Sequence, residues 1–225
     1  MTSLKSLTLS MVAVAMLMLS AVGQLMGQQR PEEPPPGGQA LLPDLAQSIS
    51  RRNYSNGSVE SVEVEGPGFT RALRYTTTKA GHDYELNTST PVPHEFKKGE
   101  AVLISFWART VSTRRETGQG LVQVHLSEGQ SPWRQEAGRF VSFSDQWQRF
   151  YAPGVLSRDY PANHMHLKVF AGNVEQVIEI GGIELLSYGV GFDVNLLPKS
   201  LSSYEGMEEN AAWRKLAEQR IQEVR

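Results

Sequence analysis

Most residues that could bind a ligand stand at alternate positions of short segments, with apolar residues between them. In the segment 164–170 (HMHLKVF), His166 and Lys168 alternate with Met165, Leu167 and Val169. A period of two places the polar side chains on one face of a strand and the apolar side chains on the other. Seven residues follow this rule on the predicted strands: Arg74, Gln123, His125, Arg149, Tyr151, His166 and Lys168.

If these strands share a sheet, the seven residues form a groove of hydrogen-bonding groups with an aromatic ring. Such a groove suits a polyhydroxylated chain, because planar polar groups bond the hydroxyls and rings stack on the sugar faces. The outer face of an antiparallel sheet is also polar when it only meets water. A ligand groove and an ordinary solvated face therefore both remain open at this point.

Tryptophans give a second indication of ligand binding. Trp133 lies in the polar segment 130–135 (QSPWRQ), where an exposed indole could stack on a sugar ring. The alternative is a loop aromatic folded back over the edge of a sandwich. Trp107 and Trp147 lie in predicted strands, and we expect Trp107 in the core and Trp147 in the core or half-buried. Trp133 is therefore the eighth candidate binding residue.

No pattern in the sequence predicts catalysis or metal binding. The motifs G-x-S-x-G, the P-loop and H-E-x-x-H are absent. A carboxylate pair could hydrolyse a glycosidic bond, but Glu179 and Glu184 have the spacing of ordinary strand residues. His164 and His166 could ligate a metal ion from one strand face, yet no third ligand is evident. We therefore predict no catalytic residue, no metal ligand and no cofactor.

Composition limits the classes of partner. The chain has 225 residues, 40% of them hydrophobic, which is enough for one domain with a proper core. The formal net charge of −2 gives no electrostatic reason to bind nucleic acid or an anionic membrane. Cysteine is absent, which excludes disulfides, thiolate metal sites and a cysteine nucleophile.

The strand pattern predicts an antiparallel β-sandwich. The segment 99–109 (GEAVLISFWAR) is apolar on both faces, which is typical of a central strand covered on each side. Eight or so short strands follow one another at intervals of about ten to fifteen residues, without helical periodicity, and a jelly roll is the natural version. The apolar positions change parity at Gly181 and Gly182, which indicates a β-bulge.

The ends of the chain differ in character from its middle. Residues 1–27 resemble a secretory signal peptide, with Lys5 before an apolar run, and an uncleaved membrane anchor is the alternative. Residues 28–52 are rich in Pro and Gly and predict a flexible leader, with a short helical turn within 44–52. Residues 53–192 form the predicted sandwich, and 193–225 a linker and an amphipathic helix. The sandwich is then expected outside the cytoplasm, secreted or periplasmic.

Four segments resemble a known family. They are VLISFWARTVSTRRETGQGLVQVHL (102–126), WQRFYAP (147–153), QVIEIGGIELLSYG (176–189) and YEGMEENAAWRKLAEQRIQEVR (204–225). The first three are similar to the N-terminal carbohydrate-binding jelly-roll module of secreted family 10 glycoside hydrolases, itself similar to families 4, 9 and 22. The fourth resembles the helical lead into the xylanase barrel of those proteins. The resemblance extends from Ser58 to Arg225.

The resemblance implies a galactose-binding-like jelly roll that binds plant β-glycan, most of all xylan. It also implies a C-terminal catalytic domain as a partner, although the barrel and its paired catalytic glutamates have no counterpart in this sequence. Many such modules hold a structural calcium ion, but no cluster of Asp residues fixes one here. The expected function is binding without catalysis. The alternatives are a structural sandwich without a ligand and the N-terminal fragment of an active endo-1,4-β-xylanase.

Overall fold

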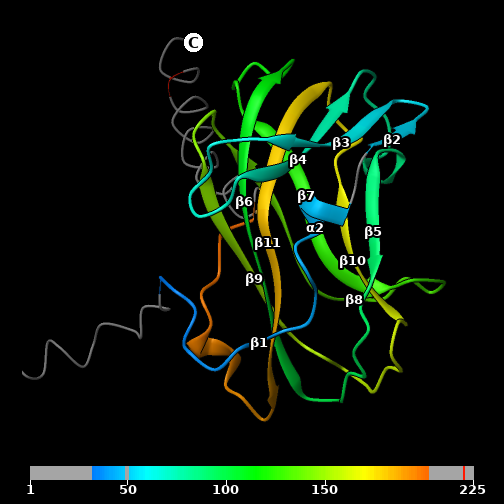
Figure 1. Cartoon of the computed structure of the whole chain (residues 1–225), viewed down its shortest axis with the longest axis vertical. Helices are drawn as coiled ribbons and strands as arrows, with labels where there is room; N and C mark the ends of the chain where they lie inside the picture. Colours follow the sequence, from blue (N-terminus) through cyan, green and yellow to red (C-terminus); the bar gives the residue numbers. More distant parts are fainter. Residues whose placement is uncertain (1–31, 49–50, 203–219, 221–225) are drawn as a thin grey trace, which may run out of the picture.

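Two antiparallel sheets face each other across the core in the computed structural model, which describes residues 32–48, 51–202 and 220 (Figure 1). The larger sheet, sheet A, has the strand order β2-β3-β4-β11-β6-β9, and β1 pairs with β11 outside this path. Its strands are β1 (Gln39–Ala40), β2 (Arg51–Tyr54), β3 (Gly57–Glu63), β4 (Arg71–Thr77), β6 (Glu100–Thr113), β9 (Gln148–Val155) and β11 (Gln176–Val190).

The smaller sheet, sheet B, has the strand order β5-β10-β7-β8. Its strands are β5 (Asn87–Pro91), β7 (Gly120–Glu128), β8 (Gln135–Phe143) and β10 (Met165–Phe170). The described helical turns are α2 (Leu45–Ser48), η1 (Asp83–Glu85) and η2 (Val194–Leu196). All strand pairs are antiparallel, so the predicted antiparallel sandwich is confirmed.

The segment predicted to be central lies in β6, which pairs with β11 on one side and β9 on the other. Val102, Ile104 and Phe106 are fully buried in the core between the sheets. On the outer face of sheet A, Leu103 packs in a second apolar cluster with Leu197 from the C-terminal side. Both faces of residues 101–106 are therefore covered, as the apolar pattern predicted.

The predicted bulge at the glycine pair is present in β11. The register between β11 and β6 shifts between Gly181 and Glu184, and this shift keeps Ile180 and Ile183 in the core. Gly181 must lack a side chain, because a Cβ there would lie 2.2 Å from the ring of Phe69. The bulge thus preserves burial on the inner face and admits an aromatic ring on the outer face.

The predicted boundaries of the leader and linker need correction. Part of the Pro/Gly-rich leader packs on the sandwich: β1 pairs with β11, and Leu41, Leu45 and Ala46 are buried in the core. The short helical turn predicted nearby is α2. After residue 192 the chain forms η2 and buries Leu197, so this stretch is not an extended linker. Burial of these three apolar side chains fixes the leader on the sandwich although its composition is typical of a flexible segment.

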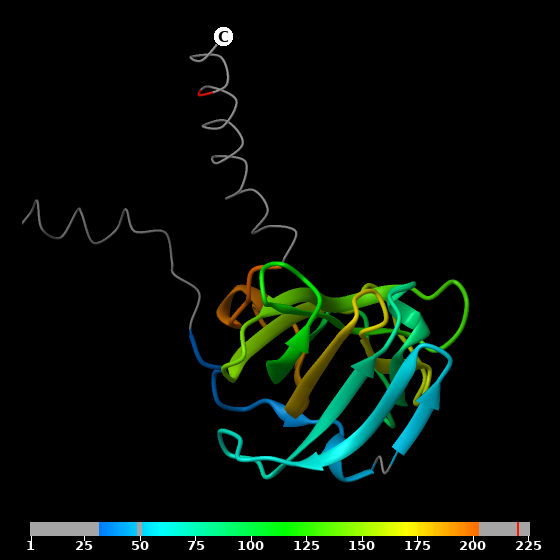
Figure 2. The ribbon, with the colours of Figure 1, turned by 90° about the horizontal axis from the view of Figure 1, so that it is seen from above.

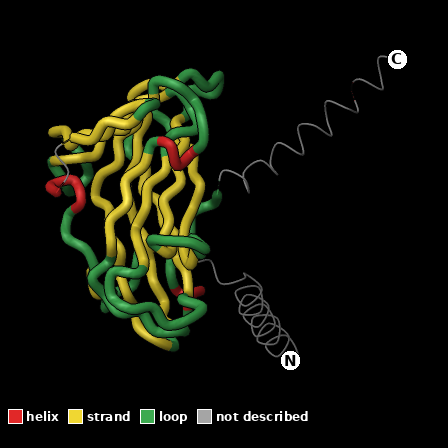
Figure 3. The backbone as a smooth tube through the Cα atoms, turned by 90° about the vertical axis from the view of Figure 1, so that its right-hand side faces the viewer, coloured by secondary structure: helices red, strands yellow, loops and turns green. Residues whose placement is uncertain are grey.

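Both ends of the described chain meet the outer face of sheet A. The Tyr188 hydroxyl donates a hydrogen bond to the Pro35 carbonyl (3.0 Å), and the Tyr151 amide donates one to Ser200 Oγ (2.9 Å). Figures 2 and 3 show these ends on one side of the sandwich. Within the described ranges, no helix is long and apolar enough to cross a membrane. The predicted signal peptide (1–27) and the predicted helix over 208–225 lie outside the described residues, apart from residue 220.

Candidate functional site

A groove of about 760 Å³ lies on the outer face of sheet B. Val122, Val124 and Leu126 of β7 point into the core, so the residues between them point outward into the groove. Four of the eight predicted binding residues line it: Gln123, His125, Trp133 and Lys168. Seven others were not predicted from the sequence: Tyr84, Asn87, Ser89, Ser127, Gly129, Gln135 and Phe170.

Strand register brings the groove residues into rows across sheet B. Lys168 on β10 lies opposite Ser89 on β5 and opposite His125 on β7. His125 in turn lies opposite Gly138 on β8, where a Cβ would come within 2.5 Å of the Cβ of His125. Because Gly138 has no side chain, there is room for the His125 side chain at this position. Residues far apart in sequence form one floor because β10 lies between β5 and β7.

His125 is a buried polar group on this floor. Only 5% of its surface is exposed, its ring meets the ring of Phe170 edge to face at 4.6 Å, and its Nδ1 atom has no hydrogen-bond partner. Burial, helped by the charge of Lys168, lowers the pKa of His125 to about 4. The imidazole is therefore neutral at pH 7. In that state it can accept or donate a hydrogen bond to a ligand.

Ser127 and Lys168 extend the polar floor. Ser127 is buried, and its Oγ atom has no hydrogen-bond partner. The Lys168 amine donates a hydrogen bond to the Glu128 carbonyl (2.7 Å) and lies 4.8 Å from the centre of the Trp133 ring. Burial lowers the pKa of Lys168, and the negative charge of Glu128 opposes that change. The floor thus combines unpaired polar groups with a cation under an aromatic ring.

Trp133 forms a wall of the groove. Its side chain is 58% exposed, which agrees with the prediction of an exposed indole rather than one folded into an edge. Its φ angle of 59° lies in the left-handed region, which a bulky residue rarely adopts. The loop that carries Trp133 is closed by Glu128, whose Oε2 accepts a hydrogen bond from the Arg134 amide (3.1 Å). This loop therefore holds the indole over the groove at some conformational cost.

The rim is polar and aromatic. The Gln123 amide donates a hydrogen bond to Gln135 Oε1 (3.2 Å), joining β7 to β8 at the surface. On the other side, Tyr84 is 53% exposed and stacks on the ring of His82. The groove therefore has an exposed ring on each side, from Tyr84 and Trp133, and amide groups between them.

His166 shares the strand face of Lys168 but does not line the groove. Its Nδ1 atom lies 2.9 Å from Ser89 Oγ, and its ring fills the space where a Cβ of Gly129 would lie. Burial, with the charge of Lys168, lowers the pKa of His166. His164 instead stacks on Tyr160. Among the described residues, no group of three or more His, Asp or Glu side chains could hold a metal ion.

The remaining three predicted binding residues, Arg74, Arg149 and Tyr151, lie on the other sheet. They belong to β4 and β9 of sheet A, so the seven strand residues do not share one sheet and do not form a single groove. Arg74 and Arg109 both donate to the fully buried carboxylate of Glu179, at 2.9 Å and 2.7 Å from their Nε atoms. Alternation shows which residues point outward, but not to which sheet a strand belongs.

Arg149 and Tyr151 contact the N-terminal part of the described chain. Both donate hydrogen bonds to Glu33 Oε2, at 2.8 Å and 3.2 Å. Burial raises the pKa of Tyr151 to about 12, so its hydroxyl stays a donor. Trp107 lies on this outer face, only partly buried, with the guanidinium of Arg149 5.8 Å from its ring. The prediction of Trp107 in the core is therefore wrong, whereas Trp147 is half-buried, as expected.

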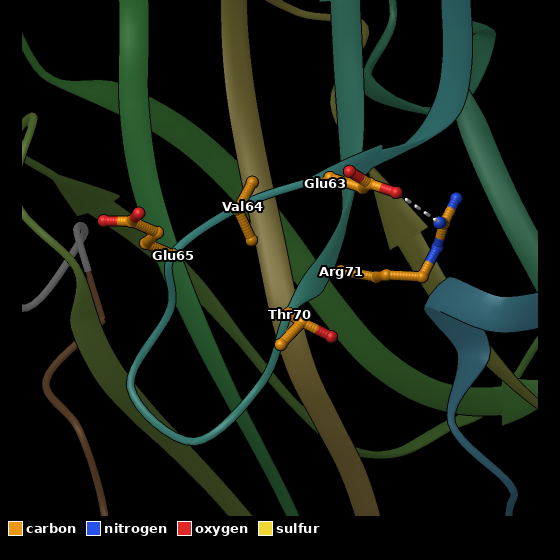
Figure 4. Close-up of a pocket in the computed structure, with 5 residues that line it drawn as sticks. All are labelled: Glu63, Val64, Glu65, Thr70 and Arg71. Atoms are coloured by element: carbon orange, nitrogen blue, oxygen red, sulfur yellow. Dashed lines mark ion pairs between the residues drawn. The ribbon is translucent and has the colours of Figure 1, made fainter.

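A second hollow, of about 480 Å³, lies at the turn between β3 and β4 (Figure 4). Figure 4 shows Glu63 and Arg71 turned toward each other, and their charged atoms form an ion pair at 3.7 Å. None of the described residues that line it has a buried polar atom without a partner. This hollow therefore lacks the unpaired floor of the sheet B groove.

No family model and no curated protein matches the chain. Among solved structures, it is similar to an arabinose-bound GH51 α-L-arabinofuranosidase, with 13% identity, a TM-score of 0.50, and 71% of this chain but 27% of that chain covered. It is also similar to the CBM22-1 xylan-binding domain of Paenibacillus barcinonensis Xyn10C, with 12% identity, a TM-score of 0.46, and 67% and 96% covered.

A third similar structure is a CBM4 module, with 15% identity, a TM-score of 0.43, and 60% of this chain and 77% of that chain covered. Similar solved structures thus include modules of families 4 and 22, as the sequence resemblance predicted. The chain spans about a quarter of the length of the arabinofuranosidase. At such low identities a likeness shows the fold alone, here the two-sheet antiparallel sandwich.

Proposed function

We propose that this chain is a carbohydrate-binding module of the jelly-roll kind, which binds a plant β-glycan, most of all xylan, in the groove of sheet B. One observation carries the proposal: His125 and Ser127, which line the floor of a groove walled by the exposed Trp133, each have a buried polar atom without a partner, Nδ1 and Oγ respectively. Buried polar groups in proteins are nearly always hydrogen-bonded, so two unpaired groups in one groove support the binding of a ligand that pairs with them.

A sugar chain fits this combination of groups. Each hydroxyl is both a donor and an acceptor, so it can pair with a neutral imidazole, a serine hydroxyl or an amide. The pyranose ring presents C–H groups that pack on an indole face. The groove volume of about 760 Å³ lies within the usual range of roughly 300–1,000 Å³ for ligand sites.

We further infer the biological setting from the sequence. A signal peptide over residues 1–27 would deliver the module outside the cytoplasm, where plant polysaccharide is found. Binding of this kind holds a linked or neighbouring enzyme near its substrate and raises the effective concentration of that substrate. N-terminal sequencing of the protein recovered from culture medium tests secretion: a start near residue 28 is expected, and retention in the cell with residue 1 intact would contradict it.

Affinity electrophoresis of the purified protein tests the binding proposal. Gels contain soluble xylan, mixed-linkage β-glucan or mannan, and a pull-down tests insoluble cellulose, with serum albumin as the reference that does not bind. We expect retardation by xylan and weaker or no retardation by mannan. A protein that migrates unchanged in every gel and stays in the cellulose supernatant would overturn the proposal and favour a sandwich with a structural role.

A further inference from the structure

The described residues that line the groove on sheet B include one positive charge and no negative charge. Of the described residues that line it, Lys168 alone bears a formal charge at pH 7, and no Asp or Glu is among them. The other polar groups there are amides, hydroxyls and the neutral imidazole of His125. Lys168 is therefore the one charged group of this lining that could pair with an anionic ligand.

The Lys168 amine is hydrogen-bonded to a carbonyl and not to a carboxylate. Its amine has three N–H donors, and one of them goes to the carbonyl of Glu128, a neutral acceptor. The carboxylate of Glu128 points elsewhere: Oε2 accepts from the Arg134 amide, and Oε1 lies 3.7 Å from His164 Nε2. Within the described part of the chain, no carboxylate forms an ion pair with Lys168.

Burial makes the missing partner important. Lys168 is only 6% exposed, and a buried charge is unfavourable unless it is paired and hydrogen-bonded. Two arginines of the other sheet show the paired arrangement. On sheet A, for example, Arg74 and Arg109 share the buried carboxylate of Glu179. Lys168 differs from these arginines, because the negative charge of Glu128 acts on it only from a distance and no carboxylate pairs with its amine directly.

We infer that the groove selects glycans that bear carboxylate groups, as uronic acid substituents, and that Lys168 determines this specificity. This inference rests on the proposed function and names the substrate class for the same groove. A uronate carboxylate would accept hydrogen bonds from the Lys168 amine while the sugar ring packs against Trp133, beneath which the amine lies. His125 and Ser127 would pair with hydroxyls of the same chain.

Paired ligands test this selectivity on the unaltered protein. Isothermal titration compares a xylo-oligosaccharide that carries one glucuronic acid with the unsubstituted oligosaccharide of the same length. We expect the acidic ligand to bind roughly tenfold more tightly, the size of one hydrogen bond to a charged group. This preference should shrink as salt is raised. Equal affinity for the two ligands would overturn the inference but leave the proposed function standing, whereas no binding of either would overturn both.

A matched pair of lysine variants assigns the effect to one side chain. Lys168→Met keeps the buried stem and removes the charge, while Lys199→Met removes the same charge from an exposed position outside the groove. We expect Lys168→Met to lose the preference for the acidic ligand and Lys199→Met to keep it. A Lys168→Met protein that folds, by circular dichroism, and keeps the tenfold preference would overturn the assignment. If this variant does not fold, glucuronoxylan and its carboxyl-reduced form give the same comparison on the unaltered protein.

Discussion

Acidification should destabilise this sandwich through His125. In the unfolded chain the imidazole takes up a proton near its ordinary pKa of 6.5, while burial and Lys168 lower the pKa in the folded state to about 4. Between these values the unfolded state binds a proton that the folded state does not, so the free energy of unfolding falls as pH falls. At 1.36 kcal/mol for each pKa unit, the full effect is about 3 kcal/mol.

Urea unfolding from pH 7 to pH 4 measures this effect by comparison with His125→Gln. The variant removes the titrating ring but leaves the carboxylates and His166, whose lowered pKa acts in the same direction. We expect the free energy of the wild type to drop by about 3 kcal/mol more than that of the variant over this range. Two parallel curves would refute the reasoning, because they would mean that the imidazole is not held away from water in the folded state.

Four further substitutions, one of them a matched control, test the site and its support. Trp133→Ala should weaken polysaccharide binding roughly tenfold in electrophoresis and change thermal stability little, since the indole is largely exposed. Glu179→Gln should lower the free energy of unfolding by about 2 kcal/mol, below the usual ~3–5 because its two arginines are one-third exposed. The matched Glu184→Gln, at a half-exposed carboxylate on the same strand, should lower it by less than about 1 kcal/mol. Gly138→Ala should cost about 1–3 kcal/mol by crowding His125.

Each of these expectations has a result that contradicts it. A large loss of stability with unchanged binding in Trp133→Ala would place the indole in the core. Equal losses in Glu179→Gln and Glu184→Gln, measured by urea unfolding, would mean that burial of the first carboxylate is not important. An unchanged melting temperature in Gly138→Ala would show that His125 can move aside at no cost.

Many strands were predictable because a strand with one buried face alternates apolar and polar residues in its sequence. β10 follows a period of two, the middle of β6 is apolar on both faces, and the parity change at Gly181 and Gly182 marked the bulge. The N-terminal stretch was not predictable in the same way. β1 has only two residues, and Leu41 and Leu45 lie in a short stretch without a strand period that follows a run of Pro and Gly, so their burial depends on partners that are far away in sequence.

The site was predictable in part, for a related reason. Gln123, His125 and Lys168 were correctly placed together because they lie on adjacent strands, β7 and β10. Ser127 continues their alternation and could have been found by extending the β7 pattern by one step. Trp107 was misplaced because an apolar run does not show how far each face is covered. Membership of sheet A or sheet B depends on strand order, which local periodicity does not contain.

A chemical-shift map with xylohexaose tests most directly the central claim that a sugar chain binds in the groove of sheet B. The protein is labelled with ¹⁵N and titrated, and shifted amides are assigned to strands. We expect the largest changes in β7 and β10, around His125 and Lys168, and at the indole N–H of Trp133. Changes confined to sheet A around Arg149, or no change with millimolar ligand, would contradict it.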